Sequence, residues 1–225
     1  MSALSPLGAG LSLFAHPFSS YCWKVLIPLW MDGTPFDYRS LDNAPDQMDD
    51  LRALWPFGKF PLLVDDGVAI TETTCIIEHL QACHPGPNVW IPDGETGRRV
   101  RFLDRFFDRY VMDAMGGAVT NALRPADAKD DFGEALGRAT VIIAYDWLEA
   151  NLPDSQWAVG NSFTLADCAA APALFYADWI EPIGPERPRL AAYRARLLAH
   201  PMVARAVEEA RPFRHYFPLG APDRD

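Results

Sequence analysis

Residues 58–74 carry side chains and backbone groups suited to holding a small anionic ligand. The stretch Thr71-Glu72-Thr73-Thr74 opens a run with helical spacing, so its hydroxyls and backbone N–H groups lie at a predicted helix N-terminus, which attracts anions. Pro61 cannot donate a ladder hydrogen bond and is expected at the first position of a strand, with a cis bond to Phe60. A special proline beside an anion-binding helix start indicates a backbone clamp for a small peptide-like ligand.

A second polar group, Ser19, Ser20 and Tyr21, stands at the predicted start of another helix. A hydroxyl at such a position can donate to sulfur while the helix dipole favours the anion, and a thiolate is the nucleophilic form of a thiol. The plain alternative is that Ser19 is an N-cap that satisfies the helix start. Cys22 has no Cys-x-x-Cys partner and is predicted to be a buried packing thiol rather than a redox nucleophile.

The elements that must position these groups alternate between strand and helix up to about residue 85. Asp66-Gly67 between two apolar runs predicts a type I′ hairpin, because both central residues of that turn need positive φ. Pro28 is predicted to strain or shorten the first helix. The expected elements are strands at 11–15, 36–41, 62–64 and 68–70, helices at 21–30 and 73–83, and a short surface helix or loop at 44–54. This order is βαβαββα, with a parallel first crossover and an antiparallel hairpin.

Beyond a linker rich in Pro and Gly at residues 85–94, only helical periodicity appears. Thr164 and Asp167 have the spacing of a capping box, in which Thr164 is the N-cap. Pro172 is predicted either to kink the helix that follows or to be accommodated by packing. We therefore expect an α/β domain over residues 7–85 and an all-α domain over residues 98–225.

Composition and charge exclude several classes of protein. The net charge of -10 disfavours nucleic acid binding, and the apolar runs are too short to span a membrane. The N-terminus lacks the pattern of a signal peptide, so a cytoplasmic location is expected. The four cysteines lack pairing or metal spacing and are expected to be free, mostly buried thiols. The five histidines show no ligand spacing, so no metal is expected.

The order of these elements and their motifs resemble the glutathione S-transferase family. Residues Ser19 to Val25 resemble the Ser-Ser-Cys-x-x-Arg-Val signature of zeta-class enzymes, and Pro17-Phe18-Ser19 is similar to the tau-class motif. The zeta signature has Cys where this chain has Tyr21 and Arg where it has Lys24, which argues against the maleylacetoacetate isomerase activity of that class. The resemblance implies a thioredoxin-like N-terminal domain and an all-α helical bundle as the C-terminal domain. The family also has a box like Thr164–Asp167, which guides folding.

The resemblance implies a role for individual residues toward glutathione. Ser19 would contact the cysteinyl thiol, with Ser20 as the reserve candidate. Phe60, before Pro61, would pair its backbone with the cysteinyl backbone, and Lys59 would neutralise the glycyl carboxylate. Thr73 would hold the γ-glutamyl carboxylate, and Glu72 would face the α-ammonium group.

The implied function is a glutathione transferase with glutathione as co-substrate and a hydrophobic electrophile as second substrate. Two alternatives stay open, a glutathione-dependent thiol-disulfide reductase or isomerase, and a non-catalytic glutathione-binding regulatory protein. The family also implies a homodimer, for which the mixed charges between Arg98 and Arg109 offer an interface. The cluster at 211–217 is expected to fold over the second pocket or to seal the helical domain. Six residues are expected to line that apolar pocket, namely Phe18, Phe106, Tyr110, Met115, Tyr176 and Trp179.

Overall fold

The computed structural model describes residues 10–225 and groups the chain into two compact units, Met1–Trp90 and Ile91–Asp225. The predicted start of the first domain at residue 7 lies outside the described residues. The domain bounds 7–85 and 98–225 stay a prediction.

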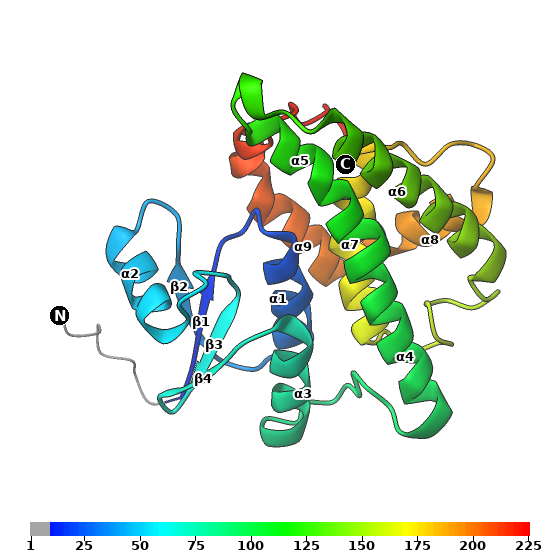
Figure 1. Cartoon of the computed structure of the whole chain (residues 1–225). Coiled ribbons are helices and arrows are strands. Elements are labelled where there is room, and N and C mark those ends of the chain that lie inside the picture. The colour runs from blue at the N-terminus through cyan, green and yellow to red at the C-terminus, as the bar shows by residue number, and fades with distance from the viewer. Residues whose placement is uncertain (1–9) are drawn as a thin grey trace. The chain divides into compact units, whose positions relative to one another are not determined.

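The first unit contains the expected βαβαββα order. Its elements are β1 (Leu11–Ala15), α1 (Ser20–Asp32), β2 (Asp37–Ser40), α2 (Pro45–Leu54), β3 (Leu62–Asp65), β4 (Val68–Ile70) and α3 (Thr73–Cys83). Within the described residues the strands form one four-stranded sheet of order β2-β1-β3-β4 (Figure 1). β1 runs parallel to β2 and antiparallel to β3, and β3 pairs antiparallel with β4, as the connections predict.

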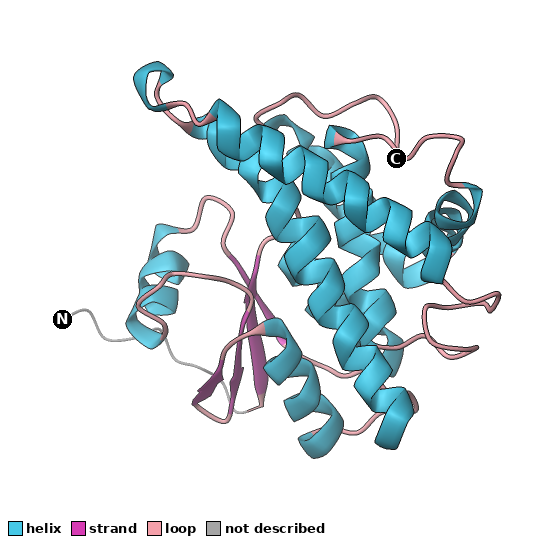
Figure 2. Ribbon diagram, turned by 45° about the vertical axis from the view of Figure 1, so that its right-hand side comes forward, coloured by secondary structure: helices cyan, strands magenta, loops and turns pink. Residues whose placement is uncertain are grey.

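Helices cover both faces of this sheet (Figure 2). On one face Leu51 of α2 packs with Phe14, Leu62 and Val64 of the strands in a fully buried cluster. On the other face α1 and α3 lie side by side (Figure 1). Alternate residues of β1 and β3 therefore face opposite layers, which is why both strands are mostly apolar and buried on both faces.

Local sequence sets the ends of several elements. Asp66 and Gly67 have φ values of 45° and 83°, so the predicted hairpin with positive φ at both central residues is confirmed. Gly33 ends α1 in the left-handed region and donates its N–H to Leu29 and Trp30 carbonyls. The expected shortening of α1 at Pro28 is wrong, because the helix continues to Asp32 with the proline buried inside it. Packing compensates for the lost backbone hydrogen bond there.

Asp32, the last residue of α1, holds the segment that follows α3. Its carboxylate accepts hydrogen bonds from the Asn88 side-chain amide at 2.7 Å and from the Trp90 indole N–H at 2.7 Å. The backbone N–H of Asn88 adds a third, longer contact at 3.3 Å. The beginning of the predicted linker is therefore ordered by a single carboxylate.

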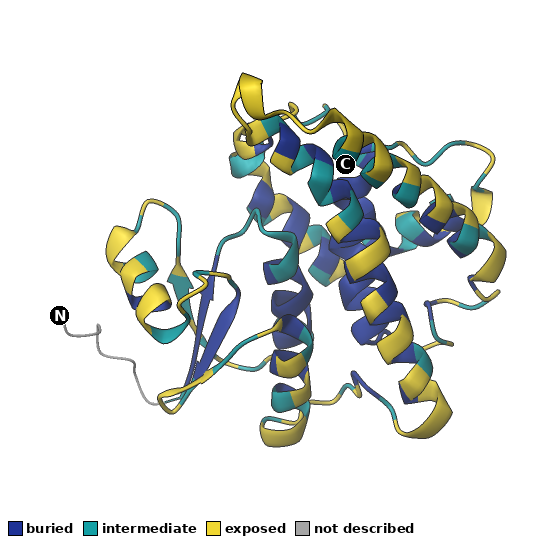
Figure 3. Cartoon of the chain, viewed as in Figure 1, coloured by how far each residue is buried: buried dark blue, intermediate teal, exposed yellow. Residues whose placement is uncertain are grey.

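The second unit is helical, as expected. Its elements are α4 (Gly94–Phe106), a π-helical segment (Phe107–Met112), α5 (Asp113–Leu123), α6 (Asp131–Asn151), α7 (Leu165–Ile180), α8 (Pro188–Ala199) and α9 (Pro201–Ala210), with short 3₁₀ segments at Ala126–Ala128 and Arg211–Tyr216. Helix α7 is buried along nearly its whole length (Figure 3). The predicted capping box of Thr164 and Asp167 opens it. We find Pro172 inside α7, which continues through it.

Burial corrects two expectations from the sequence. Asp104 and Asp108 are buried, so they cannot belong to an exposed mixed-charge face between Arg98 and Arg109. Cys22 and Cys168 are buried, but Cys75 and Cys83 are exposed, and none of the four forms a disulfide. Among residues 10–225 there is no helix that is both long and apolar enough to cross a membrane.

Candidate functional site

The strand register gathers the predicted site segments at one end of the sheet. Phe14 pairs with Leu62, so the chain leaving β1 toward Ser19 lies beside Pro61, which enters β3. Leu63 pairs with Ile70, so the chain leaving β4 toward Thr73 emerges at the same end. Three loops far apart in sequence therefore converge there because β1, β3 and β4 alternate in direction.

Ser19 is the N-cap of α1. Its backbone is extended, and its Oγ accepts a hydrogen bond from the Cys22 N–H at 3.4 Å. The turn before it is fixed because the Trp23 indole N–H donates to the Pro17 carbonyl at 2.6 Å. An oxygen that accepts at an N-cap still carries its own hydrogen, which can be donated to a further partner. Capping and thiol activation are therefore compatible roles for this hydroxyl. Ser20 is the first residue of α1 and is partly buried.

Cys22 is an inert thiol, as predicted. Burial raises the pKa of the Cys22 thiol to about 12, although hydrogen bonds with the Ser19 side chain and the His16 backbone oppose that rise. The thiolate is the reactive form, and at neutral pH a thiol with this pKa is almost entirely protonated. The turn at Ser19 thus contains a hydroxyl in contact with sulfur but no reactive cysteine of its own at position 22.

The peptide bond between Phe60 and Pro61 is cis, which confirms that prediction. Pro61 is buried, and Phe60 packs partly against the cluster under α2. Lys59 is exposed to solvent. Its long side chain is free to reach a carboxylate, but exposure fits a solvated charge equally well.

The start of α3 has an unusual backbone. Glu72, the N-cap residue, has φ of 65° and ψ of 122°, a region that residues other than glycine rarely adopt. Among the described residues no side chain caps this helix, so the N–H groups at its start are not satisfied by an N-cap side chain. Thr73 is buried, and the Glu72 side chain is exposed. A strained backbone at a helix start is typical of ligand-binding sites.

Lys24 reaches the same helix start from α1. Its side chain is buried, and its Nζ lies 3.4 Å from the Thr74 hydroxyl. A buried ammonium group one residue from Thr73 adds positive charge to the positive end of the α3 dipole. In the sequence Lys24 stands out only as a departure from arginine, because nothing in the local pattern shows that α1 and α3 are neighbours.

A second cluster lies at the opposite end of β3 and was also missed. Asp65 Oδ2 lies 2.8 Å from His79 Nε2 and 2.7 Å from His84 Nε2. Hydrogen bonds from His84 and His79 hold the pKa of the Asp65 carboxyl below its ordinary value. The absence of a metal was expected because the five histidines show no ligand spacing along the chain, and two of them nevertheless meet here at one carboxylate. Spacing along the chain could not show it, since Asp65 comes from the hairpin.

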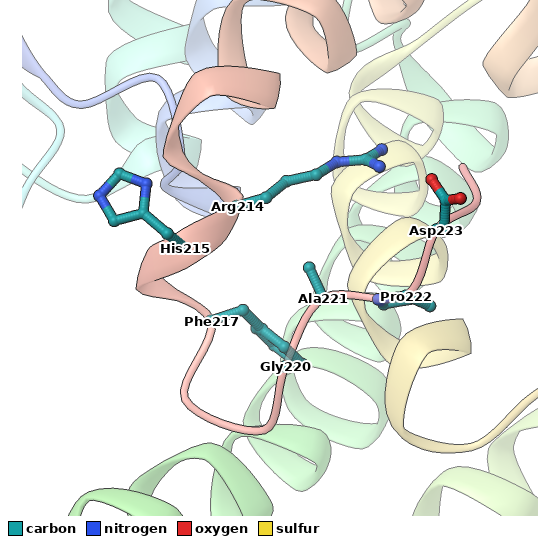
Figure 4. A pocket seen from close by; sticks show the side chains of 7 residues that line it. All are labelled: Arg214, His215, Phe217, Gly220, Ala221, Pro222 and Asp223. Carbon is teal, nitrogen blue, oxygen red and sulfur yellow. The ribbon is translucent and has the colours of Figure 1, made fainter.

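The C-terminal tail borders an open pocket of about 330 Å³ in the second unit, lined by residues between Arg214 and Asp223 (Figure 4). The Arg214 guanidinium pairs with the Asp225 carboxylate, and Arg224 pairs with Asp178 of α7. The first pair lies within the C-terminal segment, and the second joins the end of the chain to α7. Of the residues expected to line a second pocket, Phe106, Met115 and Tyr176 are buried, whereas Tyr110 is exposed.

Two family models match this chain, one in each unit. The model described as "Glutathione S-transferase, N-terminal domain" matches residues 13–88. The model described as "Glutathione S-transferase, C-terminal domain" matches residues 126–196. The first match includes every residue assigned above to glutathione.

Individual proteins support the same assignment. A probable maleylacetoacetate isomerase of Caenorhabditis elegans is 26% identical over 169 residues, covering 74% of this chain and 78% of that protein. A stringent starvation protein A homolog of Haemophilus influenzae is 26% identical over 216 residues, covering 94% of this chain and 97% of that protein. A solved glutathione S-transferase of Methylobacterium radiotolerans, in complex with glutathione sulfonate, is 25% identical with a TM-score of 0.74, covering 88% of this chain and 95% of the other.

Proposed function

Because this chain belongs to the glutathione S-transferase family, we propose that it is a glutathione transferase in which Ser19 activates the thiol of bound glutathione. The main support for this proposal is that the Ser19 turn, the Phe60–Pro61 bond and the start of α3 lie together at one end of the sheet. These three segments offer a hydroxyl, a backbone edge and an anion site, which are the groups that a tripeptide thiol needs.

In this proposal the start of α3 holds the γ-glutamyl end of glutathione. The Thr73 hydroxyl and N–H donate to the carboxylate, and the exposed Glu72 side chain faces the α-ammonium group. The buried Lys24 ammonium strengthens the positive potential at this helix start. Phe60 pairs its backbone with the cysteinyl residue, and Lys59 faces the glycyl carboxylate. Ser20 is the reserve donor.

The chemistry is then a nucleophilic addition or substitution. The glutathione thiol loses its proton to solvent, and the Ser19 O–H donates to the resulting thiolate at the N-terminus of α1. The sulfur forms a bond to an electrophilic carbon of a hydrophobic small molecule. In a substitution, a leaving group departs from that carbon with its bonding electrons. In an addition, water protonates the neighbouring atom that receives the displaced electron pair.

Of the two alternatives, the thiol-disulfide reductase loses support and the non-catalytic glutathione-binding protein gains it. A thiol-disulfide reductase needs a reactive cysteine at this turn, and Cys22 is buried with a pKa of about 12. A glutathione-binding protein without conjugating activity is the second candidate, because a relative matched over 94% of this chain is named a stringent starvation protein A homolog. We also propose a cytoplasmic location, which the free thiols of the exposed residues Cys75 and Cys83 support.

We further propose that the protein is a homodimer, with an apolar rather than a mixed-charge interface. Phe132, Leu136 and Ile143 of α6 are 80%, 59% and 68% exposed. Their spacings of four and seven residues put them on one face of the helix. A stripe of this kind is costly in water and suits a second copy of the same face. Sedimentation should give twice the chain mass, and Ile143→Glu should give a monomer; a monomeric parent protein would contradict this proposal.

Replacing the hydroxyl of Ser19 tests the proposed activity. Ser19→Ala should lower turnover with a model electrophile by ~10²-fold or more, because a positioned donor to the thiolate is lost. Glutathione affinity, measured by calorimetry, should stay within about twofold, since the anion site at α3 is unchanged. The matched variant Ser20→Ala should leave turnover nearly unchanged. If Ser20→Ala or Tyr21→Phe is the damaging change, Ser19 is wrongly assigned. Binding of glutathione by the parent protein without any turnover would favour the non-catalytic candidate.

A further inference from the structure

The cluster of Asp65, His79 and His84 has the composition of a transition-metal site. Two imidazole nitrogens and one carboxylate oxygen lie within 4.8 Å of one another. Imidazole and carboxylate together suit Zn²⁺ and related first-row ions, whereas Mg²⁺ and Ca²⁺ prefer oxygen ligands alone. Sets of two histidines and one carboxylate leave coordination positions for water.

The fold brings these three side chains together from two elements, the end of β3 and the C-terminal half of α3. Asp65 is the last residue of β3, His79 lies in α3, and His84 is the C-cap residue of that helix. The His84 N–H is fixed by the Leu80 carbonyl at 2.8 Å, and the two imidazole rings have centroids 6.0 Å apart. Both rings present Nε2 to the same Asp65 oxygen. The two Nε2 atoms therefore face one carboxylate oxygen, as the ligands of a single ion would.

The distances leave room for an ion after a small adjustment. A tetrahedral Zn²⁺ with bonds of about 2.0–2.1 Å holds its ligand atoms about 3.3 Å apart. The present hydrogen bonds of 2.7 and 2.8 Å must each lengthen by about half an ångström. The side chains of Asp65, His79 and His84 are 16%, 26% and 33% exposed, so they can rotate, and water can reach a remaining position.

We propose that Asp65, His79 and His84 form a binding site for a divalent transition metal ion, with Zn²⁺ as the preferred ion and water completing its coordination. The ion replaces the shared hydrogen bonds, with each neutral imidazole ligating through Nε2 and the Asp65 carboxylate supplying negative charge. The site is separate from the residues assigned to glutathione. It joins the β3–β4 hairpin to the C-terminal end of α3, and so fixes the helix whose other end carries Thr73.

Titration of the untagged full chain with ZnCl₂ and CoCl₂ tests this site. Calorimetry should give one Zn²⁺ per chain, and Co²⁺ should show the visible bands of a low-coordinate ion without a thiolate charge-transfer band. Saturating Zn²⁺, at about 100 times its dissociation constant, should raise the melting temperature by about 5 °C or more. Mg²⁺ should do neither. Failure to bind Zn²⁺ saturably overturns the proposal and leaves an ordinary hydrogen-bonded cluster.

Variants decide which side chains hold the ion. His79→Ala and His84→Ala should each weaken Zn²⁺ binding by about 100-fold or more, because loss of a ligand exceeds the usual effect of an outer-shell change. Asp65→Asn should weaken it as well, and circular dichroism shows whether each variant is folded. Two control variants, His215→Ala and Cys83→Ser, should bind as the parent does. If Cys83→Ser abolishes binding, the exposed thiol beside His84 holds the ion and the proposal is wrong.

Discussion

The N-termini of α3 and α7 both carry a threonine and an acidic residue, but in the described part of the chain only the one at α7 is capped by side chains. At α7 the Asp167 carboxylate accepts hydrogen bonds from the Thr164 N–H at 2.9 Å, the Ala158 N–H at 2.9 Å and the Tyr193 hydroxyl at 2.7 Å. The whole group is buried. At α3 the Glu72 carboxylate is exposed and caps nothing among the described residues, while its own backbone has φ of 65°.

In the proposed function, this difference distinguishes a structural helix start from one that binds a ligand. Asp167 supplies from within the chain the negative charge and the acceptors that a helix N-terminus requires. At α3 no N-cap side chain among residues 10–225 supplies them, and a buried lysine and a backbone with positive φ lie beside that helix start. Similar residue types thus form a self-contained cap at one helix and, in the function proposed here, a carboxylate-binding site at the other.

The largest effect on stability should come from removing the carboxylate that caps α7. Asp167→Ala leaves several buried donors without an acceptor, so we expect the free energy of unfolding to fall by about 3 kcal/mol or more. Urea unfolding followed by tryptophan fluorescence measures this. Asp154→Ala, a change at an exposed aspartate of the same unit, should cost under about 0.5 kcal/mol. Equal effects of the two variants would mean that the buried network contributes little.

The next largest effect concerns glutathione binding at the start of α3. Thr73→Ala should raise the glutathione dissociation constant about tenfold or more, because a hydrogen bond to a charged group contributes about 1.5–3 kcal/mol. Thr164→Ala is the matched change at α7, and it should leave that constant unaltered while lowering stability by about 1 kcal/mol. Calorimetry with glutathione and urea unfolding give both numbers. Overlapping binding curves for the Thr73 variant and the parent protein would remove Thr73 from the site.

The smallest effect on stability distinguishes backbone strain at Glu72 from the usual cost of glycine inside a helix. Glu72→Gly should raise the free energy of unfolding by about 1 kcal/mol, since glycine adopts positive φ without steric conflict. Glu78→Gly, at an exposed position inside the same helix, should lower it by about 1 kcal/mol. Opposite signs in thermal or urea unfolding are the expected outcome. A loss of stability at both positions would show that the Glu72 backbone carries no strain.

Features fixed by neighbours in sequence could be predicted from the chain. Asp66-Gly67 specifies its hairpin because of the φ values it needs, and the helix predicted at 73–83 begins and ends as expected. The capping box at Thr164 is equally local. Pro28 shows the limit of this reasoning, because its local preference against a helix interior was overcome by packing around a buried ring.

Features that depend on contacts between distant segments were missed. Asp104 reads as a surface charge among arginines, but only the packing of the second unit shows that it is buried. The approach of Lys24 to Thr74 joins two helices fifty residues apart, and Asp65 meets His79 and His84 only after the hairpin and α3 are in place. The candidate anion site was therefore visible in the sequence, whereas its electrostatic support and the histidine cluster were not.

The carboxylate of Asp32 also bears on how the first unit should be produced by itself. A fragment cut at residue 85, where the sequence changes character, would lose both Asn88 and Trp90. It would leave a bare carboxylate at the end of α1, next to the gap left by a large indole that is 1% exposed in the intact chain. A fragment extended through residue 90 retains both partners. Spectroscopic work on glutathione titration in a shortened protein should therefore start from the longer piece.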